Sequence, residues 1–460
     1  MKPTRTYLSL LALAAPLFAG IQPGITLLPK TGGSPLVDET GTTLKTLGYG
    51  SYSGYLTDSA TIIHTASASG LNCGAATSGK IQEHDWNGVL KWEYTWATST
   101  TILHHSINLM PTGSVLAVGY EQISGVCQEV IFEYSPARKA IVWEWHSKDH
   151  ISTDTYNPRK FKSSLVSGND PYHVNSVAYD AQKDMIVFSS HYLNEIFVID
   201  HSTTTSQAAS STGGKYNKGG DILWRWGKAS NYGVTATDTT WFNVVHGANV
   251  IPAGYPGSGN FLAYANKNPA TSVAAAYEIQ PVLDDTGFRI DPTSKKFLAT
   301  LVTNIKLPTG TTNWGLVQRL LNGDYLITHG NSGKILEATS AGAFVDTISG
   351  SSVARAIRYN WDFKGLSKLN DSRYTGGAVA IAAKPRSDNG VIASNGKIAI
   401  HGLADNAVTM VVDMQGRVMA RPAAVQGIAT VSTLGWPRGV YRVVMNNAGK
   451  LESHQVTVLP

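Results

Sequence analysis

Short alternating runs of apolar and polar residues, most of them closed by Gly, Asp or Asn, cover most of the chain. In one recurring pattern, an apolar strand is followed by a short turn and a second strand that carries tryptophan. Its clearest copies are IQEHDWNGVLKWEY (residues 81–94) and VIFEYSPARKAIVWEW (130–145), a third copy with a long insertion spans 196–227, and weaker copies span 277–283 and 335–348. Alternation with a period of two residues predicts β-strands joined by hairpins.

A second type of hairpin precedes each copy, as in INLMPTGSVLAVGY (107–120) and VNSVAYDAQKDMIVFSS (174–190). Each unit thus contains about four strands and repeats roughly every 45–80 residues, which is typical of propeller blades with variable loops. About five units fall within residues 52–350. Residues 24–48 supply two strands without partners, and joining them to late strands in one sheet would remove an exposed edge. The sequence therefore predicts an all-β fold with a six-bladed β-propeller, with seven blades as the alternative.

The pattern changes near the C-terminus. Residues 373–390 have the Gly, Ala and Pro content of a linker, which limits the propeller to residues 20–372. Residues 391–460 return to short alternating strands. We expect this last segment to form a small immunoglobulin-like β-sandwich.

The N-terminus reads MKPTRTYLSLLALAAPLFAG, with Lys2 and Arg5 before an apolar stretch that is too short to cross a bilayer. This arrangement predicts a secretory signal peptide over residues 1–19. We expect the mature protein to be exported to the periplasm, the cell surface or the medium, and we predict no transmembrane segment after the signal peptide.

Composition agrees with an all-β protein, because only 15% of residues are charged while the chain has 45 Gly, 11 Trp and 20 Tyr. The net charge of +5 comes without a block of Lys and Arg, so nucleic acid is not an expected partner. The two cysteines, Cys73 and Cys127, are compatible with one disulfide in an exported protein or with two buried thiols.

Three histidines open hairpins at equivalent places in successive units: His105, His173 and His246. A single histidine is usually just a hydrogen-bonded polar residue. The innermost strand of a propeller blade begins near the central channel, however, so residues at this phase can face one shared pocket. The same reasoning applies to His104, and we expect one of the neighbouring pair His104 and His105 to face the channel.

The motifs HHSINLMPTG, VWEWHSKDHI, YHVNSVAYD, VVHGANVIPAGYPGSGN and RAIRYNWDF resemble those of the bacterial arylsulfate sulfotransferases, in their secreted propeller branch. The resemblance covers roughly residues 24–369. It implies a six-bladed propeller that moves a sulfuryl group from a phenolic sulfate ester to a phenol, with no cofactor and no metal. A covalent sulfohistidine intermediate is implied as well.

Matching the family's motifs residue by residue makes His246 the implied nucleophile and His105 and His173 the other catalytic histidines. Asn175 and His104 are the implied substrate-binding residues. Neutral imidazole is a suitable nucleophile for a sulfate ester, and other histidines can protonate the leaving phenoxide or deprotonate the incoming phenol.

The sequence departs from the family at His191, in SSHYLNEI, where the family's motif has arginine. We include His191 as the fourth candidate catalytic residue, although histidine lacks the permanent charge and the forked donors of arginine. Two alternatives stay open. The chain could be an inactive propeller that serves as an extracellular or cell-surface binding protein, or the four histidines could hold Zn²⁺ or Cu²⁺.

The C-terminal segment has a resemblance of its own. VTMVVDMQGRVMARP and WPRGVYRVVMNNAGKLESHQVTV resemble the sorting domain of type IX secretion substrates. That resemblance implies that export machinery is the partner of residues 391–460. A β-sandwich with no such role is the alternative.

Overall fold

The computed structural model describes residues 21–458 apart from 75, 236–240, 286, 351, 376–390, 395–396, 402, 404–406, 414–417, 425–427, 434–435, 438 and 448–449. The predicted signal peptide (1–19) and most of the predicted linker (373–390) lie outside the described residues. Within the described residues, no helix has the length and apolar character needed to cross a membrane.

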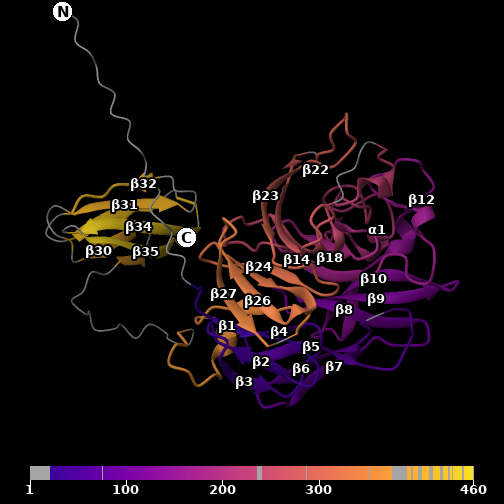
Figure 1. The fold of residues 1–460 in the computed structure, drawn as a ribbon, viewed down its shortest axis with the longest axis horizontal. Coiled ribbons are helices and arrows are strands. Elements are labelled where there is room, and N and C mark those ends of the chain that lie inside the picture. The colour runs from indigo at the N-terminus through magenta and orange to yellow at the C-terminus, as the bar shows by residue number, and fades with distance from the viewer. Residues whose placement is uncertain are drawn as a thin grey trace, which may run out of the picture.

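Six four-stranded antiparallel sheets follow one another along residues 25–359 (Figure 1). The first three sheets are β28 (Ile357–Tyr359), β1 (Ile25–Leu27), β2 (Ser34–Val37) and β3 (Thr43–Leu47); β4 (Gly54–Leu56), β5 (Thr61–Ser67), β6 (Gly79–Asp85) and β7 (Leu90–Thr95); and β8 (Thr101–Leu109), β9 (Val115–Ile123), β10 (Val126–Ser135) and β11 (Ala140–His146). The other three are β14 (Val174–Asp180), β15 (Met185–Ser190), β16 (Glu195–Asp200) and β17 (Trp224–Trp226); β18 (Asn243–Val250), β19 (Phe261–Lys267), β20 (Ala275–Pro281) and β23 (Ala299–Lys306); and β24 (Leu316–Arg319), β25 (Tyr325–Thr328), β26 (Lys334–Ala338) and β27 (Phe344–Ser349).

The sheets are arranged around a common centre. Residues of β4, β8, β14, β18, β24 and β28, one edge strand from each sheet, line a single cavity. Edge strands of six sheets can share one cavity only if the sheets surround it, which is the arrangement of a propeller. The predicted all-β propeller is confirmed.

The N-terminal and late strands share one sheet, as the unpartnered strands at residues 24–48 led us to expect. β1 pairs with β28 in antiparallel register, with Thr26 opposite Arg358, and in Figure 1 the indigo β1 lies beside the orange strands of the late part of the propeller. This pairing closes the ring, because the chain's first and last propeller strands complete each other's sheet.

Equivalent turns join the first and second strands of the sheets. Gly113 and Gly323 stand in two such turns with φ of 82° and 94°, in the left-handed region that glycine enters without strain. Apolar side chains then pack between neighbouring sheets, as Val187 and Ile196 do in one cluster with Phe261 and Tyr277. Because the hairpins repeat, corresponding ends of the inner strands lie at the same end of the ring.

One local prediction was wrong. Residues 24–48 contain three strands instead of two, because Ser34–Val37 pairs with a strand on each side. The segment 205–220 begins with the short helix α1 (Thr205–Ala208). Its far end is buried, where the carbonyl of Gly220 accepts a hydrogen bond of 2.7 Å from the indole of Trp145.

The smaller elements are single helical turns and two-stranded ribbons, namely η1 (Ser147–His150), β12 (Ile151–Ser152), β13 (Phe161–Lys162), η2 (Ser163–Leu165), η3 (Ala229–Tyr232), β21 (Leu283–Asp284), β22 (Gly287–Phe288), η4 (Gly330–Ser332) and η5 (Lys364–Leu366).

Residues 391–458 form two further sheets. One contains β29 (Val391–Ser394), β30 (Lys397–His401) and β33 (Ile428–Ser432), and the other contains β32 (Val418–Ala420), β31 (Val408–Asp413), β34 (Gly439–Asn447) and β35 (Lys450–Val458). Apolar side chains from both sheets belong to one buried cluster, for example Ile398 and Ile400 with Val443 and Val456. This part of the chain is therefore a two-sheet sandwich with its own core.

Candidate active site

Five histidines from three of the sheets form a continuous line of rings. His104 and His105 lie in β8, His173 directly precedes β14, His191 directly follows β15 and His246 lies in β18. Ring centroids are 5.0 Å apart for His104 and His105, 4.7 Å for His105 and His173, 5.1 Å for His173 and His191, and 5.6 Å for His191 and His246. All four histidines predicted to be catalytic thus lie in one cluster, with His104 at its end.

Irregular backbone aims these rings. The strand register shifts between Leu103 and Ile107 in β8 and between His246 and Asn249 in β18, and bulges of this kind re-aim side chains. His105 and His173 adopt φ of 46° and 51°. Non-glycine residues in this left-handed region cost about 1–3 kcal/mol each, and such costs are concentrated at functional sites.

Asn266 fixes the protonation pattern of His246. The Asn266 amide nitrogen donates to the carbonyl of Trp314 at 2.9 Å, and since a carbonyl can only accept, the amide oxygen must be the atom that faces His246. That oxygen is 2.6 Å from Nδ1 of His246. Nδ1 is therefore the protonated nitrogen, and Nε2 of His246 carries the lone pair.

Three histidines of the cluster, His105, His191 and His246, are neutral around pH 7. Burial lowers the pKa of His246 to about 3, although the hydrogen bond to Asn266 opposes this shift, and burial lowers the pKa of His191 to about 4. Burial, followed by the neighbouring histidines, also holds the pKa of His105 well below its usual range. A neutral imidazole with a free Nε2 is the nucleophilic form of histidine.

His173 is held by an acidic partner. Its Nδ1 lies 2.5 Å from the carboxylate of Asp170, which also accepts a hydrogen bond of 2.9 Å from the hydroxyl of Tyr120. Burial raises the pKa of Asp170, but the hydrogen bonds from His173 and Tyr120 and the neighbouring imidazoles together outweigh burial, and the pKa lies below the ordinary value. Asp170 thus remains a carboxylate that orients His173 and leaves its Nε2 toward the cluster.

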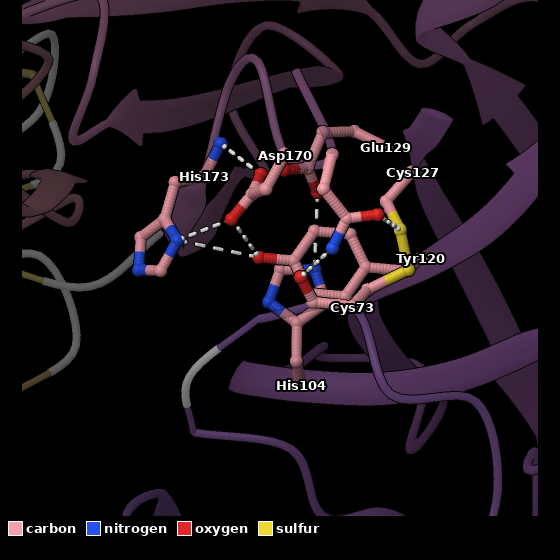
Figure 2. Close-up of a disulfide and its surroundings, with 8 residues drawn as sticks. Cys73, His104, Tyr120, Cys127, Glu129, Asp170 and His173 are labelled. Atoms are coloured by element: carbon pink, nitrogen blue, oxygen red, sulfur yellow. Dashed lines mark hydrogen bonds and ion pairs between the residues drawn. A yellow bond between two sulfur atoms is a disulfide. The ribbon is translucent and has the colours of Figure 1, made fainter. Parts of the chain in front are cut away.

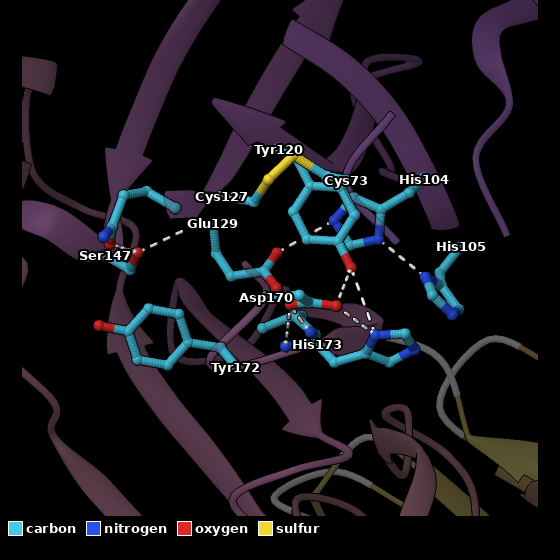
Figure 3. Close-up of polar contacts among 12 residues, drawn as sticks. Cys73, His104, His105, Tyr120, Cys127, Glu129, Ser147, Asp170, Tyr172 and His173 are labelled. Atoms are coloured by element: carbon cyan, nitrogen blue, oxygen red, sulfur yellow. Dashed lines mark hydrogen bonds and ion pairs between the residues drawn. A yellow bond between two sulfur atoms is a disulfide. The ribbon is translucent and has the colours of Figure 1, made fainter. Parts of the chain in front are cut away.

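His104 has a different position from the one predicted. It is fully buried behind His105, with its ring stacked on Tyr120 at 3.6 Å and its Nε2 3.0 Å from the carboxyl group of Glu129 (Figure 3). It lies outside the lining of the cavity that His105 reaches, so His104 is not placed to contact a substrate.

Asn175 does line that cavity, and its side-chain amide also forms a hydrogen bond to the backbone of the neighbouring strand. The side chain donates to the carbonyl of Val245 at 2.8 Å and accepts from the hydroxyl of Ser189 at 2.6 Å. Val245 precedes His246, so Asn175 ties the strand of the predicted nucleophile to the neighbouring sheet.

A disulfide joins Cys73 and Cys127, which decides the question that the sequence left open (Figure 2). Asn169 reinforces it, because its side chain donates to the carbonyl of Cys73 at 2.7 Å and its own carbonyl accepts from the amide of Cys127 at 2.8 Å. The bridge therefore links the loop before β6 to β10 and to the segment that carries Asp170.

A family model, arylsulfotransferase (ASST), matches residues 48–358, which is more than half of the chain and includes every histidine of the cluster. The chain belongs to the arylsulfotransferase family. No curated protein matches the sequence.

Solved structures similar to this arylsulfotransferase share very little sequence with it. They include the β-propeller domain of Cps50 (Swd1) from Myceliophteria thermophila, with 11% identity, 72% of this chain and 87% of that chain covered, and a TM-score of 0.36. They also include PorZ, a surface component of the type IX secretion system of Porphyromonas gingivalis, with 8% identity, coverage of 94% and 75%, and a TM-score of 0.20. Likenesses this weak carry no argument about the function of the chain.

Arg355 is a further residue of the candidate site of this arylsulfotransferase, and it was not among the site residues predicted from the sequence. This residue lies two positions before β28, is only 7% exposed, and donates to the hydroxyl of Ser106 at 3.2 Å through Nη2. Its positive charge helps to lower the pKa of both His105 and His246, after the larger effect of burial. A guanidinium thus reaches the cluster from the opposite side of the channel to His191. Arg355 is the first residue of the motif RAIRYNWDF, and nothing in the motif alone indicates that this residue faces the channel.

Two cavities meet at Arg355. A narrow one of about 20 Å³ is lined by His105, Asn175 and His246, together with Arg355. A larger one of about 360 Å³, the cavity shared by six sheets, begins beside the same arginine and is lined by Tyr55 and other residues of the inner strands. The first has room for about one water molecule, and the second is in the size range of small-molecule sites.

The metal alternative finds no support in the part of the chain that the structure describes. Within it, no group of three or more His, Cys, Asp or Glu side chains is arranged to hold a metal ion.

Proposed function

We propose that this protein is a six-bladed arylsulfotransferase that moves a sulfuryl group from a phenolic sulfate ester to a phenol through a sulfohistidine on His246. Family membership supports sulfuryl transfer in general. The observation that carries the specific proposal is the bond between Nδ1 of His246 and the amide oxygen of Asn266, because it leaves Nε2 of a neutral ring as the attacking atom.

In the first half-reaction, the lone pair of Nε2 attacks the sulfur and the bond between sulfur and the aryl oxygen breaks. The phenoxide leaves with the electron pair and takes up a proton. The sulfated ring of His246 then carries positive charge. Asn266 stabilises this charge because its amide oxygen accepts a hydrogen bond from the N–H group at Nδ1. The second half-reaction reverses these steps with another phenol and frees the histidine.

His105 and His173 are suited to move the protons. Each ring has Nδ1 engaged by a partner behind it, His104 in one case and Asp170 in the other. Each therefore has Nε2 available on the side of the cluster. A positioned histidine of this kind contributes typically about 10²–10⁴-fold to a rate.

Arg355 is our candidate for the cation that holds the sulfuryl oxygens, in place of the arginine that the family's motif has at position 191. Arginine offers a fixed fork of donors for an anionic group, whereas neutral His191 offers a single donor. The larger cavity beside Arg355 would then take the aromatic ring of the substrate.

For residues 391–460 we propose an immunoglobulin-like sorting domain that export machinery reads, with the propeller at 20–372 and a linker at 373–390. The separate core of the sandwich supports a unit that folds by itself. We expect deletion of 391–460 to leave transfer activity in the cell and to abolish delivery to the surface. Normal surface delivery of the truncated protein would contradict the sorting role.

Steady-state kinetics tests the enzymatic proposal. With 4-nitrophenyl sulfate as donor and phenol as acceptor, we expect ping-pong kinetics, and we expect His246→Ala to abolish transfer. His64→Ala is the matched control, because His64 is also a buried histidine in a propeller strand but hydrogen bonds to Thr65 and His84 instead. If the wild-type protein binds phenolic sulfates without turnover, the inactive binding protein takes the place of this proposal.

A further inference from the structure

Glu129, His104 and His105 form an unbroken hydrogen-bonded line that runs from the protein interior to the cavity (Figure 3). The carboxyl group of Glu129 lies 3.0 Å from Nε2 of His104, and Nδ1 of His104 lies 2.7 Å from Nδ1 of His105. Glu129 and His104 are 1% and 0% exposed, whereas His105 lines the cavity. The inner end of the line is therefore sealed from solvent, and its outer end faces the site of the reaction.

The contact between the two rings constrains where the protons are. Two unprotonated nitrogens would repel each other at 2.7 Å, and two protonated ones would clash, so one proton lies between the Nδ1 atoms. Two arrangements satisfy this condition. Either Glu129 is protonated and Nε2 of His105 carries a proton, or Glu129 is a carboxylate and Nε2 of His105 carries a lone pair.

The geometry points to a proton relay. We propose that Glu129, His104 and His105 lend one proton to the departing phenoxide in the first half-reaction and recover it from the acceptor phenol in the second. The inference deepens the transfer reaction proposed above and rests on it.

Every proton in this exchange is accounted for. Nε2 of His105 gives its proton to the phenoxide oxygen, Nδ1 of His105 receives the proton of His104 Nδ1, and Nε2 of His104 receives the proton of Glu129. After these transfers, Glu129 is a carboxylate and Nε2 of His105 carries a lone pair. When the acceptor phenol gives its proton to His105, the same three transfers run backwards and no proton has to come from solvent.

The surroundings of Glu129 favour its protonated form at rest. Burial raises its pKa well above the ordinary value, the charge of Asp170 raises it further, and the hydrogen bond of 2.7 Å from the amide of Val174 only partly offsets these effects. Burial likewise lowers the pKa of His104 to about 3, so the pair is neutral. Tyr120, Tyr172 and His173, together with Asp170, are the other titratable groups at this end of the line.

The backbone is bent in a way that the relay requires. Neighbouring residues of a regular strand point to opposite faces of the sheet. His105 instead adopts φ of 46°, held by a hydrogen bond of 2.9 Å from its amide to the carbonyl of Ala76, and this turns its ring back toward His104. A histidine needed only to fill the interior would not require this conformation.

Glu129→Gln tests the relay with little change of shape. The glutamine oxygen can still accept from Val174 and its NH₂ can still donate to His104, but the amide has no proton to give up. We expect kcat for phenyl sulfate, whose phenoxide leaves poorly without a proton, to fall by roughly 10²–10⁴-fold. For 4-nitrophenyl sulfate, whose leaving group needs no proton, we expect a loss of less than about tenfold.

Asp221→Asn is the matched control. Asp221 is also a buried carboxylate bonded to a buried histidine, His150, at 2.8 Å, but the pair lies outside the channel. We expect this variant to keep the wild-type ratio of the two rates. If Glu129→Gln does not accumulate as folded protein, His104→Gln interrupts the same line and should give the same pattern.

An active wild-type enzyme whose two rates fall equally in Glu129→Gln would overturn the relay and leave the proposed function intact. A wild-type protein with no turnover would overturn both. Infrared difference spectra of wild type minus Glu129→Gln give a readout that needs no turnover. We expect a protonated-carboxyl band in the wild type that the variant lacks, and its absence would contradict the resting state on which the relay depends.

Discussion

The amide oxygen of Asn266 lies 2.6 Å from Nδ1 of His246, and the amide nitrogen of the same residue is held by Trp314 and Thr311. Asn266 is fully buried and cannot rotate without losing these bonds. One side chain on β19 thereby sets which nitrogen of a histidine on β18 is free to react.

Replacing Asn266 should affect the chemical step more than substrate binding. Asn266→Leu removes the acceptor for Nδ1, and we expect kcat to fall by about 10–100-fold with little change in KM, because hydrogen bonds to a charged group are worth about 1.5–3 kcal/mol. Asn266→Asp keeps an acceptor and should recover part of the loss. Equal losses in the two variants would show that Asn266 only fills space.

Arg355 should be required for transfer. Arg355→Ala removes the guanidinium that we assign to the sulfuryl oxygens, and we expect a loss of roughly 10²–10³-fold in kcat, the usual cost of losing such a donor. Arg355→Lys should lose less. Lys183→Ala, which removes a cation from the opposite end of β14, serves as the control, with transfer rates measured for all three variants.

His191→Arg should raise the rate of the wild-type enzyme, because it restores the arginine of the family's motif beside His173 and His246. The same change should partly rescue Arg355→Ala. A double variant no faster than Arg355→Ala alone would show that positions 191 and 355 do not serve the same anionic group.

The sulfation of His246 should be insensitive to moderate acid. Because the pKa of this ring is lowered to about 3, it remains neutral as the pH falls from 8 to 5. A histidine with the ordinary pKa of about 6.5 would be only a few per cent neutral at pH 5 and would react roughly 30-fold more slowly than at pH 8. Single-turnover rates across this range, measured with 4-nitrophenyl sulfate, distinguish the two cases.

Loss of the disulfide should destabilise the propeller near the site. Cys73 and Cys127 are 54 residues apart, and closing a loop of that length stabilises a protein by about 4 kcal/mol in the chain-entropy estimate. We expect Cys73→Ser with Cys127→Ser to lower the free energy of unfolding in urea by about 2–4 kcal/mol. An unchanged midpoint of unfolding would contradict this prediction.

The repeated strands made part of the site predictable. His105, His173 and His246 each stand next to a register shift of an inner strand, at equivalent places in the repeat, so their phase along the chain was enough to bring them together. Their partners carry no such signal. Asn266 is one polar residue near the end of another strand, Glu129 is one of two glutamates in β10, and both become meaningful only once the sheets are placed side by side.

The fold likewise has features that the sequence predicts and features that it does not. The hairpin turns at Gly113 and Gly323 and the unpartnered N-terminal strands were sufficient to predict a closed propeller. The strand Ser34–Val37 was missed, and it contains Pro35, which removes a donor that a strand normally uses. The buried carbonyl of Gly220 has no signal in the local sequence, because its partner Trp145 is 75 residues away.

Mass spectrometry of the protein after incubation with 4-nitrophenyl sulfate, with no acceptor added, tests the central claim most directly. We predict one sulfuryl group on the peptide that contains His246, its loss when a phenol is added, and no label on His246→Ala. Released nitrophenol with the label on another residue, or no label on any histidine of the wild-type protein, would contradict the account.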